Sequence, residues 1–143
     1  MPGRNDPYGA FNFLIELDGA PTGGFSEVSG LSTETDVIEY RNGDDVAGIR
    51  KLPGLPKYAD ITLKRGFTQS RDLWEWRRTV INGQTERRSG RIIVLSEARE
   101  PVLRFRFNDG WPSRWDGPAL DAMSKGVAIE TLVISHEGLR LDD

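Results

Sequence analysis

The chain has 143 residues, of which 37% are hydrophobic and 29% are charged, and this length suits a single domain with one core. It has no apolar run of the roughly 20 residues that cross a bilayer and no apolar segment behind its polar start, so we expect neither a membrane span nor a secretory signal, and we expect a cytoplasmic origin. The absence of cysteine excludes disulfides and thiolate metal sites, and a formal net charge of -3 argues against general affinity for nucleic acid.

The first half of the chain carries the patterns of β-strands, separated by Asn-Gly and Asp-Gly pairs that favour tight turns. Side chains two residues apart predict a half-buried strand that ends at Asp18-Gly19: Phe11, Phe13, Ile15 and Leu17. We expect further strands over residues 24–29, 33–40 and 60–67, the last with three inward side chains, Ile61, Leu63 and Phe67.

Residues 41–57 contain repeated glycine and proline and few side chains that would pack in a core. The residues themselves therefore predict a long loop, and long loops in compact domains are usually disordered or functional. The one predicted helix follows over residues 71–82, with Ser70 as its N-cap and Gly83 at its end. Its apolar face, which we expect to lie across the sheet, contains Leu73, Trp76, Val80 and Ile81.

The last third of the chain returns to strand patterns. The apolar run Ile92-Ile93-Val94-Leu95 predicts a strand over 90–96 that is buried on both faces beneath the helix. Residues 101–108 alternate, and we place Leu103, Phe105 and Phe107 inward and Arg104 and Arg106 outward. A loop that contains Trp111-Pro112 and Trp115-Asp116-Gly117-Pro118 then leads to a last strand at about 127–136.

Patterns of catalytic and metal-binding residues are scarce. His136 is the single histidine, so a histidine cluster for a metal is excluded and we assign this side chain a structural role. The chain contains no Walker-type phosphate loop, GxGxxG or GxSxG motif. The acidic pairs Asp44-Asp45 and Asp142-Asp143 fall in a loop and at a terminus, where solvated charge explains them. We expect no enzyme, no cofactor and no metal.

The four tryptophans leave an alternative open. Three of them could stack on sugar rings in a carbohydrate-binding β-sandwich module: Trp74, Trp111 and Trp115. We favour the interpretation that Trp76 belongs to the core and that the others cover the sheet or fill contacts between subunits. A hydrolase is a third and weaker reading.

Assembly is the function that a small β domain most readily permits. Exposed sheet edges must be covered or paired, and pairing between copies around an axis would close a ring that repeated contacts could extend into a stack. Charged neighbours such as Arg104 with Arg106, or Glu34 with Asp36, fit a wet channel or an outer surface. The loop at 41–57 could then connect one ring to the next.

Short blocks with a characteristic order and spacing extend over nearly the whole chain. They lie at residues 6–13 (DPYGAFNF) with 16–19, at 24–31 (GFSEVSGL), at 39–43 with 50–54, at 63–66, at 73–77, at Trp111-Pro112, and at 128–132 with 136–139. Together they resemble the tail tube proteins of contractile phages and of related extracellular contractile injection systems. Residues 39–43 and 50–54 are similar to that family's long connecting hairpin.

The resemblance implies a mainly β (α+β) fold over residues 1–143, sandwich-like or barrel-like, with one flanking helix and a long β-hairpin loop. It also implies a structural subunit of an inner tube, in which homohexameric rings stack around a channel for effector proteins or DNA. The implied partners are further copies of the chain, a contractile sheath, a baseplate and a spike. Such a particle would assemble in a bacterial cytoplasm and work as a phage-tail-like particle, without stable membrane insertion.

By the same resemblance, the segment around 41–57 provides contacts between stacked rings and between subunits. The expected contact residues are Glu39, Arg41, Arg50, Lys51, Leu52, Pro53 and Lys57. Among them, Arg41, Arg50 and Lys51 are available for ion pairs across the interface.

Overall fold

The computed structural model describes residues 9, 12–18, 20–21, 24–41, 43 and 48–142. In chain order the elements are β1 (Phe13–Leu17), β2 (Ala20–Pro21), β3 (Glu27–Ser29), β4 (Thr33–Tyr40), β5 (Arg50–Tyr58), β6 (Ile61–Gly66), α1 (Asp72–Ile81), β7 (Arg88–Leu95), β8 (Pro101–Asp116), β9 (Ile129–Ser135) and β10 (Gly138–Asp142). The fold is therefore mainly β with one helix, as the sequence predicted. No helix in the described ranges is long and apolar enough to cross a membrane.

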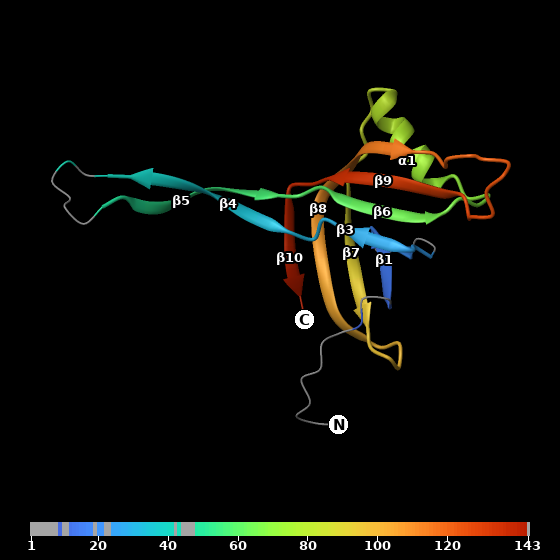
Figure 1. Cartoon of the computed structure of the whole chain (residues 1–143), viewed down its shortest axis with the longest axis horizontal. Helices are drawn as coiled ribbons and strands as arrows, with labels where there is room; N and C mark the ends of the chain where they lie inside the picture. The colour runs from blue at the N-terminus through green and yellow to red at the C-terminus, as the bar shows by residue number, and fades with distance from the viewer. Residues whose placement is uncertain are drawn as a thin grey trace.

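Eight strands form one antiparallel sheet that the long strand β8 divides into two halves. The strand order is β2-β1-β7-β8-β9-β6-β3, and β10 pairs with the first part of β8 on the edge opposite β7. The first part of β8 pairs with β7 and β10, whereas its last part pairs with β9. The two halves run in different directions (Figure 1), and both contribute side chains to one core. The described strands do not close into a barrel, so the sandwich-like version of the prediction is the correct one.

One core fills the space between the two half-sheets and beneath the helix. Its buried side chains come from β1, β6, α1, β7, β8 and β9: Ile15, Leu17, Ile61, Leu63, Leu73, Trp76, Ile92, Phe107, Leu132 and Ile134. Each such side chain contributes about 1.5–3 kcal/mol when it leaves water. The ring of Phe107 occupies the space where side chains at Gly90 and Gly110 would lie, since a Cβ there would approach it to 2.6 and 2.7 Å. Two glycines thus make room for the largest side chain of β8 in the core.

The helix follows its prediction closely at both ends. Leu73 and Trp76 are buried, α1 lies against β8, and Gly83 ends the helix with a φ of +77°. Two details of the prediction are wrong. Ser70 is not the N-cap; its hydroxyl instead donates to the Asp72 carboxylate, which also accepts the Leu73 N–H at 2.9 Å. Ile81 is 57% exposed, because it lies on the last turn, beyond the sheet.

The strand predictions succeed where the residues alternate and fail where proline or glycine interrupts them. The predicted strand at 33–40 matches β4, and those at 24–29, 60–67 and 127–136 contain β3, β6 and β9. The predicted strand at 90–96 covers all of β7 except its first two residues. Residues 50–58 form strand β5 rather than a loop, and β8 continues through Trp111-Pro112 to Asp116 rather than ending at Asn108. Strand β10 was not predicted. The third inward side chain of β6 is Arg65 rather than Phe67, because Phe67 lies past the end of that strand. Phe11 lies outside the described residues.

Candidate functional site

The most prominent exposed feature is the hairpin of β4 and β5. These strands form a separate two-stranded sheet that pairs with none of the other described strands. It extends away from the body of the molecule (Figure 1). The pairing runs from Thr33 opposite Tyr58 to Tyr40 opposite Arg50, with an irregularity between Thr35 and Val37. The resemblance to a connecting hairpin is thus the better guide here than the glycine and proline content.

The hairpin exposes apolar side chains that have no core to enter. Every side chain of β4 is exposed, and Val37 and Leu55 are 63% and 74% exposed. Two prolines in β5, Pro53 and Pro56, lack the N–H that a strand normally contributes to pairing. A two-stranded hairpin is marginally stable in water by itself. Exposed apolar surface on such an element is typical of an interface with another molecule.

The register of this hairpin pairs most of the predicted contact residues with a residue of the other strand. Ile38 lies opposite Leu52, Val37 opposite Pro53, Glu39 opposite Lys51, and Tyr40 opposite Arg50. Side chains alternate between the two faces of the hairpin, so the Ile38–Leu52 pair and the Glu39–Lys51 pair lie on opposite faces.

Two further predicted residues flank this region. The Nζ of Lys57 lies 3.0 Å from the carboxylate of Asp36, and the hydrogen bond and charge of that carboxylate raise the pKa of Lys57 above its usual value. Arg41 is exposed just after β4. The acidic pair Asp44-Asp45 lies outside the described residues.

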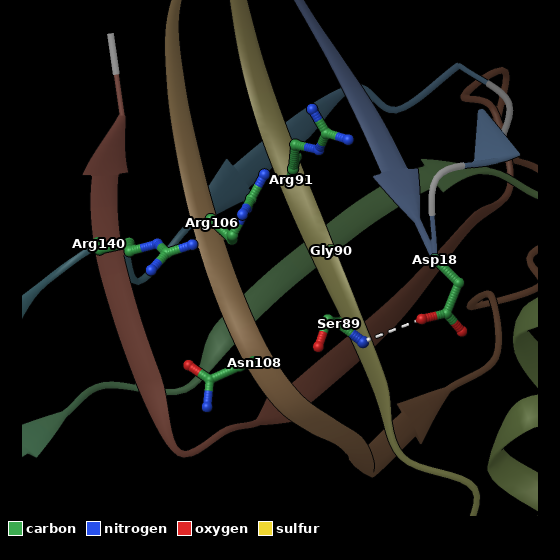
Figure 2. A pocket seen from close by; sticks show the side chains of 7 residues that line it. All are labelled: Asp18, Ser89, Gly90, Arg91, Arg106, Asn108 and Arg140. Atoms are coloured by element: carbon green, nitrogen blue, oxygen red, sulfur yellow. Dashed lines mark hydrogen bonds between the residues drawn. The ribbon is translucent and has the colours of Figure 1, made fainter.

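A second feature is a polar hollow of about 350 Å³ on the open face of the half-sheet made by β1, β7, β8 and β10. Three arginine side chains line it, one from each of three adjacent strands: Arg91, Arg106 and Arg140 (Figure 2). Asp18 lies at its rim and accepts the backbone N–H of Ser89 at 3.2 Å. Arg106 was predicted to point outward, but the alignment of three arginines depends on β10 and on the register, which the sequence did not reveal.

A buried ion-pair network joins the second half-sheet to the helix. Arg65 is 5% exposed and Glu130 is 2% exposed, and the two residues are direct partners on β6 and β9. The Nε of Arg65 donates to the Glu130 carboxylate at 2.6 Å, and its other guanidinium nitrogens donate to Asp72 at the start of α1.

Burial opposes ionisation of Asp72. Hydrogen bonds from Arg65 and Ser70, the positive charge of Arg65 and the Leu73 N–H nevertheless hold the pKa of the Asp72 carboxyl below its usual range. The sequence signal for this network was Arg65, which continues the inward alternation of Ile61 and Leu63 on β6.

Aromatic side chains gather at the start of the helix. The rings of Trp74 and Trp115 lie 4.9 Å apart and, with Phe67, line a hollow of about 190 Å³. The Trp115 Nε1 is buried and has no hydrogen-bond partner among the described residues. Trp111 does not line this hollow, so the three tryptophans of the carbohydrate-binding alternative do not form one platform here. Trp76 is in the core, as predicted.

His136 contacts two backbone carbonyl groups and two aromatic rings. Its Nδ1 lies 3.1 Å from the Gly138 carbonyl oxygen and its Nε2 lies 2.9 Å from the Ala59 carbonyl oxygen. The rings of Tyr58 and Phe107 lie 5.7 and 5.9 Å away. Among the described residues, no group of three or more His, Cys, Asp or Glu side chains could hold a metal ion.

The sequence profile of the family described as T4-like virus tail tube protein gp19 matches residues 9–140. A search of curated protein sequences found no match. Several solved structures are similar to the chain. A chain of the sheath-tube complex of an extracellular contractile injection system, PVC, in its extended state is 25% identical, with a TM-score of 0.86 and coverage of 95% of this chain and 91% of that one.

A chain of the anti-feeding prophage cap, described as the tube-terminating cap, is also 25% identical, with a TM-score of 0.86 and coverage of 98% and 93%. Hcp1 from Flavobacterium johnsoniae is 16% identical, with a TM-score of 0.58 and coverage of 92% and 94%, which supports the fold alone.

Proposed function

The chain belongs to the family of T4-like virus tail tube proteins, and from this premise we propose that it is a non-enzymatic subunit of the inner tube of a contractile injection particle. The observation that carries the proposal is the exposed hairpin of β4 and β5, which has the apolar surface of an interface and no core of its own. Tubes work by geometry, because many weak repeated contacts make a rigid shaft that can transmit force. No catalytic group is required.

We infer that copies of the chain form homohexameric rings that stack into a tube. Heterologous contacts between identical subunits close a ring when the rotation fits, and a further repeated contact between rings extends it. The hairpin provides the contact to the next ring, with apolar pairs such as Ile38 and Leu52 on one face and the charged pair Glu39 and Lys51 on the other. Arg41, Arg50, Pro53 and Lys57 belong to the same proposed interface.

The proposed partners follow from the particles in which similar chains occur. One similar chain comes from a sheath-tube complex and another from a structure of the anti-feeding prophage baseplate. We infer a contractile sheath around the tube, a baseplate and spike at one end, and a central channel for effector proteins or DNA. Assembly in a bacterial cytoplasm, followed by incorporation into a phage-tail-like particle, fits a chain without cysteine.

The proposal is tested by changing the hairpin while the core stays intact. We expect the purified chain to form rings or tubes with sixfold symmetry in negative-stain electron microscopy over a concentration series. The variant Ile38→Glu places an uncompensated charge in the proposed contact and should give folded protein without tubes. The matched variant Ile38→Val keeps the apolar contact and should form tubes like the original chain.

A second variant removes the whole element, by a short Gly-Ser linker in place of residues 34–57. Circular dichroism and thermal unfolding should show a folded body, because the hairpin contributes nothing to the core. Normal tubes from either the linker variant or Ile38→Glu would contradict the proposed role of the hairpin. Persistent monomers of the unaltered chain, with or without a preformed baseplate as nucleus, would contradict the tube itself.

A further inference from the structure

A row of like charges crosses the open face of the half-sheet formed by β1, β7, β8 and β10. Arg91 on β7 is the direct partner of Arg106 on β8, which is in turn the direct partner of Arg140 on β10. We call these three residues the arginine row; they lie side by side in Figure 2. Arg104, two residues before Arg106, lies on the same face of β8. Adjacent strands are about 4.8 Å apart, so the row is about 10 Å wide.

Such a row is unfavourable by itself, because like charges directly opposite each other on neighbouring strands repel. The carboxylates beside it compensate only in part. Glu16 lies 3.7 Å from Arg91, and Asp142 lies 3.7 Å from both Arg106 and Arg140. These distances exceed the usual 2.7–3.2 Å of an N–H···O hydrogen bond. The guanidinium N–H groups of the row therefore keep hydrogen-bonding capacity for a further anion.

The guanidinium groups are accessible to such an anion. Each side chain of the row is more than a third exposed, and all three border the hollow of about 350 Å³. The planar guanidinium fork matches a carboxylate or a phosphate and forms paired, charge-assisted hydrogen bonds with either. The chain as a whole carries a net charge of -3, so this concentration of arginine is a local feature.

Carboxylates of Glu16, Asp18 and Asp142 surround the row on the same sheet. A nucleic-acid strand presents a continuous line of phosphates, which these carboxylates would repel on both sides of the row. A short acidic stretch of protein can instead place two or three carboxylates over the row and none beyond it. We propose that this face binds an acidic segment of a partner protein through Arg91, Arg106 and Arg140.

The test measures binding of a fluorescein-labelled peptide, four glutamates flanked by Gly-Ser, to the full-length chain by fluorescence anisotropy. Arg106 is the central residue, and Arg106→Gln should weaken peptide binding about tenfold or more, because hydrogen bonds between charged groups are the strong ones. The matched control is Arg114→Gln, which removes an exposed arginine that pairs with Asp116 on the last part of β8. It changes the net charge equally and should leave the affinity unchanged.

Two further binding measurements distinguish an acidic peptide from nucleic acid and from free phosphate. An oligothymidylate of equal charge should bind more weakly than the peptide, and inorganic phosphate should compete only at concentrations far above the peptide. Equal or tighter binding of the oligothymidylate would overturn the proposal in favour of nucleic acid. Equal loss in Arg106→Gln and Arg114→Gln, or loss in neither, would overturn the arginine row as the site. Sedimentation of the same variants reports assembly separately, so a failure of the tube proposal would be recognised independently.

Discussion

The buried ion pair between Arg65 and Glu130 gives the sharpest prediction for the stability of the fold. Both side chains are almost fully buried, so solvent screens the pair little. Removal of one partner of a buried pair typically costs about 3–5 kcal/mol, because the other charge stays buried without compensation. Asp72 remains beside Arg65 in the variant Glu130→Gln, and its side chain is 42% exposed. We therefore expect the lower end of the range, about 3 kcal/mol.

The assay is urea unfolding of the monomeric chain, followed by tryptophan fluorescence and far-UV circular dichroism. A loss of about 3 kcal/mol lowers the melting temperature of a domain of this size by about 10 °C. The control is Glu75→Gln, which breaks the exposed pair with Arg78 at 3.1 Å on the helix surface and should cost less than about 0.5 kcal/mol.

We also expect the double variant Arg65→Met, Glu130→Met to lose less stability than Glu130→Gln alone. No fully buried charge remains unpaired in it, and Asp72, which loses Arg65, has a side chain that is 42% exposed. Two results would refute the argument. One is a cost for Glu130→Gln no larger than that for Glu75→Gln. The other is a double variant that is clearly the less stable of the two.

Two further predictions concern packing and pH. Gly90→Ala should destabilise the fold by about 1–3 kcal/mol in urea unfolding, because the new Cβ would lie 2.6 Å from the Phe107 ring and 2.7 Å from the Glu16 carbonyl oxygen. The control Gly24→Ala has open space around the new Cβ and should change the stability little. Equal losses of stability in the two variants would contradict this prediction. The lowered pKa of Asp72 stabilises the fold above about pH 4, the pKa of an unfolded aspartate, and this contribution is lost as pH falls further through the folded pKa. The stability advantage of the original chain over Asp72→Asn should therefore shrink between pH 6 and pH 3, and a constant difference would be the contrary result.

Much of the fold could be predicted because its core strands alternate cleanly. Ile15 and Leu17, and Ile61 and Leu63, follow the period of two that a half-buried strand requires. In residues 101–108, Phe107 is buried and Phe105 packs against the core. The helix could be predicted because Leu73 and Trp76 lie one turn apart and Gly83 stops it. These signals are local, and each of them reports burial directly.

The strands that were not predicted are those whose sequences lack the regular alternation that reports burial. Strand β5 carries Pro53, Gly54 and Pro56, which are disfavoured in the middle of a sheet but acceptable in an exposed pair of strands. Strand β8 pairs with β7 as far as Gly110 and with β9 from Trp111, and its register shifts between Pro112 and Arg114. Secondary-structure propensities alone predict loops for both segments, because they contain no information on the partner strands with which the segments pair.

The candidate sites were harder to predict because they depend on register. The outward position of Arg106 follows from alternation, but its neighbours Arg91 and Arg140 are 15 and 34 residues away in the chain and meet it only through pairing. Arg65 and Glu130 meet across β6 and β9 in the same way. The hairpin contacts came from the resemblance to tail tube proteins, since the residues of 41–57 taken alone indicated only a long loop.

The core and the hairpin should be separable in experiments, and this separation is what a tube subunit needs. The core lies between the half-sheets and shares no buried residue with the hairpin, so a change at Glu130 should lower stability without altering the surface offered to a neighbour. A change at Ile38 should do the reverse. Val37 and Leu55 add no hydrophobic stabilisation to the isolated subunit, because their side chains remain in water in the monomer. Their stabilising contribution can appear only when another molecule covers them, and measured stability should therefore rise with protein concentration in the original chain but not in Ile38→Glu.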